Sequence, residues 1–293
     1  MKDLDWDKLR SHLQWGRYRP LYDRKFSEEK KNLWSKGYSR FDKSRKEFFI
    51  KNFDLWIRSS RLNTITGLEQ FSVKQIMNGC THFIDDLHIR YGNRLVVLDK
   101  EYSYHRRLNP KIRLYNPDHL TNTDILILSC PFPWFGKEHP QTQNILDTCY
   151  QKGVKVYIDS AWYGCMRGFE FNYSHPAIEE VGFSLSKGLG LGDNRIGIRY
   201  SREKTDVSAI SVINDFDMDI ESSIIIGDHF IQTFDIDFLQ NRYSDAYTYV
   251  CEKMTLKPTN AIHMAMGINM DGLDAPVGIR PFLRYLVDDV NEF

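Results

Sequence analysis

Short apolar segments that alternate with helical patterns constrain this chain more than any other feature of its sequence. We predict strands over residues 73–77, 94–99, 124–129, 154–158, 182–186 and 195–200. The helical spacing of apolar residues predicts helices over residues 82–91, 140–152 and 237–254. Apolar strands that alternate with helices are typical of a mainly parallel central sheet with helices on both faces. The sequence therefore predicts an α/β fold.

Three polar signatures follow predicted strands. Gly79, Cys80 and Thr81 form a turn after the first strand, Asp159 ends the fourth strand, and Lys187 follows the fifth. Open α/β sheets bind their ligands at the carboxyl ends of the strands. We therefore expect these three signatures to line one site.

The composition is that of an ordinary globular protein and excludes several classes of function. The 293 residues carry no net formal charge, so neither nucleic acid nor an anionic membrane is an expected partner. The sequence has no run of roughly eighteen apolar residues and no secretory signal, so we expect no membrane span. The five cysteines are scattered and form no CxxC pair, so we expect no metal site and no disulfide framework. A reducing cytoplasm is the predicted compartment.

The residue composition and the predicted elements divide the chain into three segments. Residues 1–60 are rich in Trp, Tyr, Lys and Arg at helical spacing, and they predict an N-terminal helical segment that belongs to a small domain and a dimer arm. Residues 61–236 contain the predicted strands and form the large domain. Residues 237–293 begin with a long helix and complete a reduced small domain.

The segment 184–197, SLSKGLGLGDNRIG, carries the strongest chemical signal. Burial at the end of a strand lowers the pKa of a lysine, which makes the amine of Lys187 available as a nucleophile or base. Ser184 and Ser186 can bind a phosphate without adding charge, and the guanidinium of Arg195 can bind the same phosphate. The glycines do not fit the GxGxxG spacing of a dinucleotide loop. On spacing alone, a β-hairpin with a surface lysine stays open as an alternative.

This segment resembles the cofactor-lysine motif of class I/II aminotransferases, which are pyridoxal 5'-phosphate (PLP) enzymes of fold type I. Their motif is Ser-x-Ser-Lys, then glycines, then Arg-x-Gly, and the spacing from Lys187 to Arg195 agrees with it. The resemblance implies that Lys187 binds PLP as a Schiff base, the internal aldimine, while Ser184 and Arg195 bind its phosphate. The chain is shorter than ordinary members of the family.

The segment 156–164, VYIDSAWYG, resembles the family's strand that ends in Asp-x-Ala-Tyr. The family aspartate pairs with the pyridine nitrogen of PLP and keeps it protonated, a role that the resemblance gives to Asp159. Taken alone, an aspartate at a strand end is more often a helix cap. The family tyrosine that binds the phenolic oxygen of PLP is replaced by Trp162, whose indole N–H could donate instead; Tyr163 is the alternative.

Two further turns match the family more weakly. Gly79, Cys80 and Thr81 resemble its Gly-x-Thr phosphate turn, and a helix N-terminus suits an anion in any case. Tyr102 matches the aromatic residue that stacks on the pyridine ring, with Tyr104 as the alternative. Taken alone, such a turn fits any strand-to-helix junction, and a tyrosine at a strand end more often packs against its neighbours.

Three more positions follow from the resemblance. In the segment 129–136, SCPFPWFG, Cys130 replaces the family asparagine that bonds the phenolic oxygen. Tyr38 matches a tyrosine that reaches the phosphate of the neighbouring subunit. Arg280 matches the arginine that binds the substrate carboxylate, with Arg284 as the alternative, although a surface arginine explains the same pattern.

The resemblance implies an aminotransferase that moves an amino group from an amino acid to a keto acid, in a homodimer with sites at the subunit interface. The changed residues Cys130 and Trp162 leave open another PLP reaction, such as that of a lyase or decarboxylase. A non-catalytic binding protein with a degenerate site is a third interpretation. The retention of Lys187, Asp159 and Arg195 argues against it.

Overall fold

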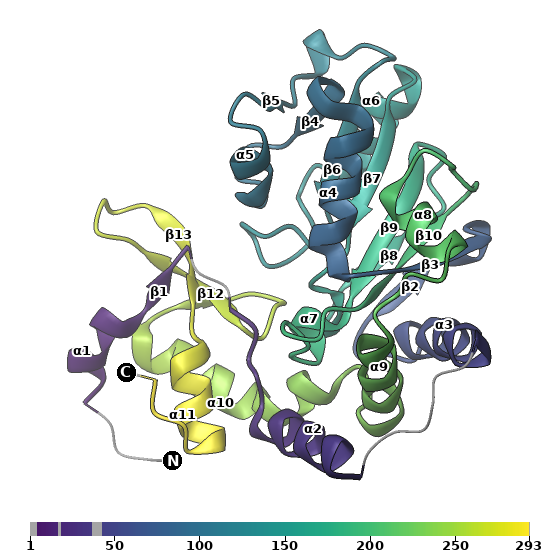
Figure 1. Cartoon of the computed structure of the whole chain (residues 1–293). Coiled ribbons are helices and arrows are strands. Elements are labelled where there is room, and N and C mark those ends of the chain that lie inside the picture. Colours follow the sequence, from purple (N-terminus) through teal and green to yellow (C-terminus); the bar gives the residue numbers. More distant parts are fainter. Residues whose placement is uncertain (1–4, 17–18, 37–42, 293) are drawn as a thin grey trace.

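The structure, a computed structural model, describes residues 5–16, 19–36 and 43–292. A seven-stranded sheet forms the centre of a large lobe, and both ends of the chain meet in a smaller lobe beside it (Figure 1). The strands of the large sheet, in spatial order, are β3 (Val73–Met77), β10 (Gly197–Ser201), β9 (Ile178–Ser184), β7 (Lys155–Asp159), β6 (Ile125–Ser129), β4 (Leu95–Val97) and β5 (Arg113–Leu114).

This sheet is mainly parallel. Strands β5, β4, β6, β7 and β9 pair in parallel, whereas β10 runs antiparallel between β9 and β3. Strand β3 therefore points in the same direction as β9. The predicted α/β fold with a mainly parallel sheet is confirmed, and each of the six predicted strands is present, although most of their ends differ from the prediction.

The largest difference lies around the predicted strand 182–186. Strand β9 ends at Ser184, and α7 (Leu185–Gly188) follows as a single helical turn. Ser184 caps this turn because its Oγ accepts a hydrogen bond from the backbone N–H of Ser186, at 3.2 Å. Strand β9 also begins four residues earlier than predicted. Its charged Glu180 hid this start in the sequence, but the side chain is buried in an ion pair with Arg90, at 2.7 Å.

Both faces of the sheet are covered by apolar side chains. In β6, Ile125 and Ile127 belong to one buried cluster together with Phe83 of α4 (Gly79–Tyr91). The alternate residues Leu126 and Leu128 belong to the cluster on the other face. Because successive residues of a strand point to opposite faces, burial of both faces produces the uninterrupted apolar runs that made these strands predictable.

Helices account for most of the remaining described chain. The predicted helices over 82–91, 140–152 and 237–254 are confirmed as α4, α6 and α10, and α4 begins three residues earlier, at Gly79. Helix α6 spans Thr142–Gln151 and α10 spans Phe238–Met254. The other helices are α1 (Trp6–Leu9), α2 (Arg24–Lys36), α3 (Lys43–Ile57), α5 (Tyr104–Leu108), α8 (Ala209–Asp215), α9 (Glu221–Thr233) and α11 (Arg280–Asp288). A separate parallel pair consists of β2 (Thr64–Thr66) and β8 (Glu170–Asn172).

The smaller lobe joins the two ends of the chain. Its antiparallel sheet has the order β1 (Gln14–Trp15), β13 (Asp274–Gly278), β12 (Met264–Ile268) and β11 (Lys257–Pro258). Arg242 of α10 fastens the two ends, because it pairs with Asp23 and, at 2.7 Å, with Asp288. This agrees with the predicted reduced small domain. The predicted domain boundaries after residues 60 and 236 stay a prediction.

The structure can be compared with what the sequence predicted about membrane spans, disulfides and metal ligands. Within the described ranges, no helix combines the length and apolar character that a membrane span needs. All five cysteines are buried free thiols. In the same ranges, no three His, Cys, Asp or Glu side chains come together in a group that could hold a metal ion.

Candidate active site

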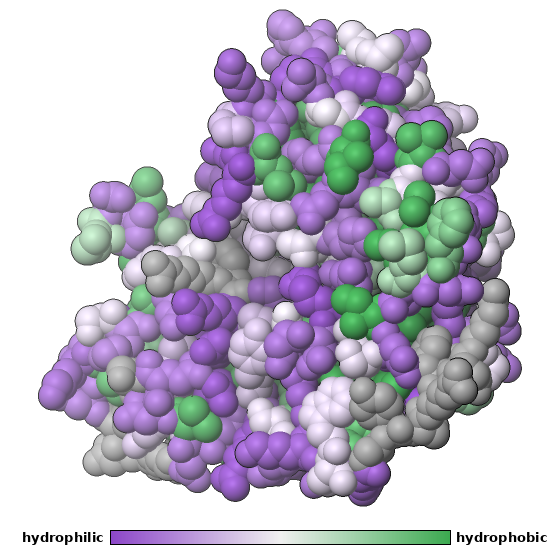
Figure 2. All heavy atoms as spheres, in the orientation of Figure 1, coloured by the Kyte–Doolittle hydropathy of each residue, from purple (hydrophilic) through white to green (hydrophobic). Residues whose placement is uncertain are grey.

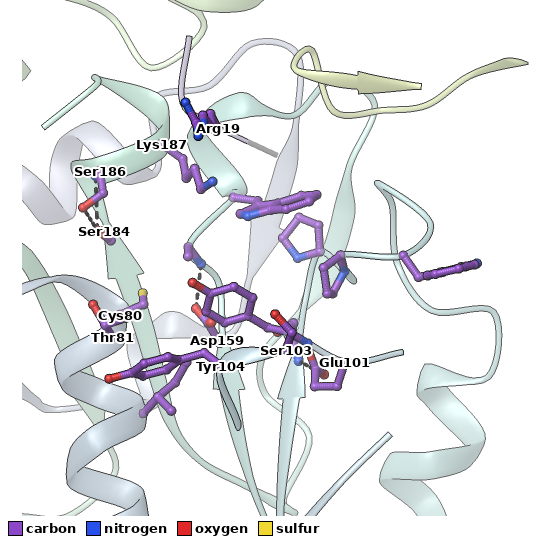
Figure 3. Close-up of a pocket in the computed structure, with 18 of the residues that line it drawn as sticks. Arg19, Cys80, Thr81, Glu101, Ser103, Tyr104, Asp159, Ser184, Ser186 and Lys187 are labelled. Carbon is purple, nitrogen blue, oxygen red and sulfur yellow. Dashed lines mark hydrogen bonds between the residues drawn. The ribbon is translucent and has the colours of Figure 1, made fainter. Parts of the chain in front are cut away.

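A cavity of about 630 Å³ opens at the carboxyl ends of the parallel strands. The loops and helices that follow β3, β4, β6, β7 and β9 contribute to its wall, which is the usual place for a ligand site in an open α/β sheet. Figure 3 shows Thr81, Asp159, Ser184 and Lys187 approaching one space from separate elements. The three polar signatures of the sequence therefore meet at one site.

The antiparallel direction of β10 explains how Lys187 and Arg195 reach the same edge of the sheet. Lys187 lies in α7, just after β9 ends, and Arg195 lies just before β10 begins. The glycine-rich segment between them turns the chain tightly. A Cβ atom on Gly188 would lie 3.0 Å from the Cα of Gly164, and Gly190 has a φ of +64°. These glycines therefore serve close packing and a turn, and not a dinucleotide loop.

Polar groups converge on a small space in front of Gly79. A Cβ atom on this glycine would lie 3.0 Å from Arg195 Nη2, 3.1 Å from Ser184 Oγ and 3.3 Å from Ser186 Oγ. Gly79 also has a φ of +71°, a conformation that favours glycine. We call Gly79, Ser184, Ser186 and Arg195 the phosphate cup, because two hydroxyls, a guanidinium and a helix start face one point.

The first turn of α4 completes this cup. The side chain of Asn78, which precedes the helix, makes no capping hydrogen bond, so it does not occupy the amide end of α4. Arg195 is held against the turn, because its Nε donates to the carbonyl oxygen of Asn78 at 3.1 Å and its Nη2 donates to Thr81 Oγ1. The positive end of the helix dipole and a fixed guanidinium thus point at the same space.

Lys187 lines the cavity with most of its side chain buried. Burial lowers the pKa of its amine to about 8, and the nearby charge of Arg195 acts in the same direction. Its Nζ lies 5.8 Å from the centre of the Trp162 ring. A lysine with this pKa has an appreciable neutral fraction near pH 8, which a surface lysine does not have.

Asp159 lies on the cavity floor at the end of β7, 5% exposed. Its Oδ1 accepts a hydrogen bond from the backbone N–H of Ala161 at 2.9 Å. Burial raises the pKa of this carboxyl, while the Cys80 thiol and the positive charge of Lys187 oppose the rise. Asp159 takes part in no ion pair among the described residues, and it lines the cavity, where a cationic group of a ligand could pair with its carboxylate.

The predicted aromatic residues lie over this floor. Tyr102 and Tyr104 both line the cavity, with ring centres 5.9 Å apart. Tyr104 donates its hydroxyl to Asp85 at 2.7 Å and is fixed by that bond. Tyr102 is 44% exposed. Of the two, Tyr102 is therefore the more accessible ring for stacking on a ligand.

Cys130 is one predicted cofactor residue that the structure does not bring to the cavity. Its thiol is 0% exposed and packs in the apolar core, while its neighbours Ser129 and Pro131 reach the wall. Its backbone is fixed from two sides, because its N–H donates to Asp159 O at 2.9 Å and its carbonyl accepts from Ser160 Oγ at 2.8 Å. The side chain therefore points into the core, where an asparagine would lose its solvation.

Trp162 does line the cavity, and a residue that the sequence did not indicate packs beside it. The ring of His263 meets the Trp162 ring edge-on, with centres 4.4 Å apart. Burial and the charge of Lys187 hold the pKa of His263 well below its usual range, so this imidazole is neutral at pH 7. The alternative residue Tyr163 is buried away from the cavity, and Tyr38 lies outside the described residues.

Arg280 lies near the cavity but is not part of its wall. Its Nη2 pairs with Glu292 at 2.7 Å, and its guanidinium lies 5.7 Å from the centre of the Tyr22 ring. Arg284 pairs with the same Glu292. The charge of Arg280 nevertheless reaches the site, because it contributes to the lowered pKa of Lys187.

Several wall residues could not have been selected from the sequence. Arg19 lies on the same side of the cavity as Lys187 (Figure 3), although the N-terminal segment carries no motif. Glu101 lies at the cavity with its carboxylate bonded to backbone N–H groups, at 2.8 Å to Tyr102 and 2.9 Å to Ser129. Lys100, the residue before Glu101, also lines the cavity and has a positive φ of 61°.

Comparison with known proteins identifies this arrangement at the level of fold. No family model matches the sequence, and no curated protein matches it. Solved structures do match it over most of its length. The PLP-bound C–S lyase from Staphylococcus hominis has a TM-score of 0.64 at 11% identity, covering 93% of this chain and 90% of that chain. Tyrosine aminotransferase from Leishmania infantum has a TM-score of 0.65 at 10% identity, covering 99% of each chain.

A third solved structure, aspartate aminotransferase from Thermotoga maritima, has a TM-score of 0.62 at 10% identity. The match covers 94% of this chain and 90% of the aspartate aminotransferase chain. The chain therefore has the aminotransferase fold of type I, with its two lobes and its site at the strand ends. The fold that the sequence motifs implied is confirmed.

Proposed function

We propose that this chain is a PLP-dependent enzyme and that it acts as an aminotransferase on an amino acid and a keto acid. One observation carries the proposal. The mostly buried Lys187 with its lowered pKa, the phosphate cup and the buried carboxylate of Asp159 face a single cavity on this fold. The solved structures with which it shares the fold include PLP-bound enzymes.

The donor set of the cavity fits PLP. The cup has donors suited to a phosphate, since two hydroxyls and a guanidinium lie within 3.3 Å of the position of an added Cβ on Gly79. Asp159 would pair with the protonated pyridine nitrogen, which would offset the burial that raises the pKa of this carboxyl. Tyr102 would cover a ring face. Trp162 would contribute its indole N–H or the flat face of its ring.

The residues of the chain would divide the chemistry among them. When bound, PLP withdraws electrons from the α-carbon of an amino acid. Lys187 would hold the cofactor covalently through Nζ. Once the amine of the substrate takes its place on the cofactor, the freed Nζ would move the proton from the α-carbon, since its pKa of about 8 leaves it partly neutral. Asp159 would keep a proton on the ring nitrogen by its negative charge. Trp162 and His263 would exclude water on the side of Lys187.

Two arginines are candidates for binding the substrate carboxylate. The resemblance favours Arg280, whose guanidinium is paired with Glu292. A carboxylate from a substrate would have to replace Glu292 at that site. Arg19 already reaches the cavity on the side of Lys187. We therefore propose Arg19 for the first contact and Arg280 for contact after exchange with Glu292.

The first test is the absorption spectrum of the purified chain with PLP, before and after reduction with borohydride. We expect a visible band that reduction removes, with the modified peptide containing Lys187 in mass spectrometry. Lys187→Ala should still take up PLP but lose turnover, whereas the exposed Lys31→Ala should behave as wild type. A chain that takes up no PLP, or a Lys187→Ala variant with full turnover, would contradict the proposal.

A lyase is the second candidate, because one of the fold neighbours is a C–S lyase. The two reactions differ in their need for an acceptor. An aminotransferase stops after its first half-reaction unless a keto acid is added to accept the amino group, whereas a lyase releases product continuously. A screen of amino acids with and without a keto acid therefore separates the two reactions.

We also propose that the chain forms a homodimer, as the resemblance implies. Figure 2 shows hydrophobic side chains gathered over α8. The exposed apolar residues there include Val212, Phe216 and Met218, which are 44%, 74% and 63% exposed. A contiguous apolar surface of this kind marks an interface more often than bare solvent contact. Sedimentation equilibrium of the full chain, compared with Phe216→Glu, tests this proposal.

A further inference from the structure

The charges that line the cavity do not balance. Among its described wall residues, the cationic side chains outnumber the acidic ones by five to two. The cations are Arg19, Lys100, Arg107, Lys187 and Arg195, and the acids are Glu101 and Asp159. Because the whole chain is neutral, this excess is local. Cavities lined by one sign of charge concentrate ligands of the opposite sign.

The proposed function, on which this inference rests, accounts for only part of the excess. Lys187, Arg195 and Asp159 would face the cofactor. Arg19 would face the carboxylate of an amino acid. Lys100 and Arg107 then remain at the cavity without an assigned ligand, with Glu101 as the acid nearest to them in the sequence.

Glu101 does not neutralise these two cations. Its side chain is turned inward, where Oε1 accepts from Tyr102 N and Oε2 accepts from Ser129 N. It is 9% exposed, and burial raises its pKa to about 7 despite these hydrogen bonds. Near pH 7 it therefore carries only part of a negative charge, and that charge is directed at backbone amides.

Lys100 is held at the cavity in a fixed place. Its Nζ lies 4.3 Å from the centre of the Trp134 ring, and both residues line the wall. Its backbone has a φ of 61°, a left-handed conformation that is unfavourable for a residue other than glycine. Strained backbone of this kind clusters at functional sites.

Arg107 differs from its neighbour on α5. Arg106 points away from the wall and pairs with Asp99 at 3.1 Å. Arg107 lines the cavity, and no carboxylate of the described residues pairs with it. Its charge is felt at the cavity wall: burial raises the pKa of Tyr102, and the positive charge of Arg107 opposes that rise. A guanidinium left in this position is suited to a carboxylate or a phosphate.

We propose that Lys100 and Arg107 form a subsite for a second anionic group, so that the substrate is an amino acid whose side chain carries a carboxylate or a phosphate. Lys100 contributes a point charge beside Trp134, and Arg107 contributes a planar fork of donors. The α-carboxylate and the anionic side chain then bind to different cations. A substrate with an uncharged side chain would leave Lys100 and Arg107 without a negative charge to pair with.

Isothermal titration calorimetry with unreactive acids tests the subsite without turnover. The probes are glutarate, 4-phosphonobutyrate and pentanoate, added to the full chain before and after loading with PLP. We expect glutarate or the phosphonate to bind at least about tenfold more tightly than pentanoate, as a charge-assisted pair implies. The preferred diacid identifies the anion, carboxylate or phosphate.

Variants locate the effect. Arg107→Gln and Lys100→Gln should each weaken diacid binding about threefold to tenfold and leave pentanoate unchanged, with smaller effects at high salt. The matched control is Arg106→Gln, which removes the neighbouring guanidinium and should leave all three acids unchanged. Equal binding of diacid and pentanoate, or equal losses in Arg106→Gln and Arg107→Gln, would overturn the subsite.

The PLP spectrum keeps the two proposals apart. If the chain takes up PLP at Lys187 but does not distinguish the acids, the subsite is wrong and the proposed function stands. If the chain takes up no PLP but still prefers a diacid through Arg107, the cavity binds dianions and the proposed function is wrong.

Discussion

Replacement of Lys187 by methionine should stabilise the protein in the absence of PLP. Burial lowers the pKa of this lysine from 10.5 to about 8. The folded state therefore resists the proton that the unfolded state binds readily, at a cost of about 1.4 kcal/mol for each pH unit of lowering. At pH 7 the charged amine thus destabilises the fold by about 3 kcal/mol, an upper value because the cavity admits water. Methionine fills a similar volume without a charge.

The pH dependence of the effect follows from its sign. The destabilisation is fully present below pH 8 and fades as the pH rises toward 10.5, because the unfolded state then also loses its proton. We expect the free energy of unfolding of Lys187→Met to exceed that of wild type by about 2–3 kcal/mol at pH 7, and by much less at pH 10.

Urea unfolding of both proteins without PLP, at pH 7 and pH 10, measures these differences. The matched control is Lys31→Met, an exposed lysine of α2. A Lys187→Met variant no more stable than wild type at pH 7 would refute the reasoning. A gain that is the same at both pH values would also refute it, since it would then come from packing and not from charge.

Three further predictions concern the site. Gly79→Ala should weaken PLP binding at least about tenfold, because the new methyl group would occupy the cup and the backbone φ of +71° is unfavourable for alanine. Equilibrium dialysis measures the loss. The control is Gly272→Ala, because Gly272 also has a positive φ but lies in open space. Asp159→Ala should lower both PLP affinity and turnover, the latter by about a hundredfold or more, in steady-state kinetics; unchanged values would make this carboxylate structural. Arg19→Gln should raise KM for the amino acid more than Arg280→Gln does if Glu292 keeps Arg280 engaged, and the reverse order would assign the carboxylate to Arg280.

The sequence predicted the sheet well because both of its faces are buried. Strands such as β6, with Ile125 to Leu128 all buried, have no polar residues to interrupt the pattern. The cofactor segment was also predictable, since the residues of the phosphate cup are local to two turns. The start of β9 was hidden because Glu180 is buried through an ion pair with Arg90 from α4, a contact between distant parts of the chain.

The parts of the site that were not predicted depend on tertiary contacts in the same way. Nothing in the local sequence of Arg19 distinguishes it from other basic residues near the N-terminus. The inward direction of the Cys130 side chain follows from hydrogen bonds of its backbone to Asp159 and Ser160, which its own segment does not reveal. The pairing of Arg280 with Glu292 depends on where the chain returns after α11.

The pairing of β1 with β13 has a consequence for how the site is completed during synthesis. Gln14 is synthesised before the large sheet, but its partner Gly278 follows only after that sheet has been made. The phosphate cup and Lys187 lie at the ends of strands of that sheet, on residues that precede β12 and β13 in the chain. A nascent chain therefore has an open half-site, and the wall that carries Arg19 closes over it last. Proteolysis of stalled chains ending before and after residue 278 would show this order of closure.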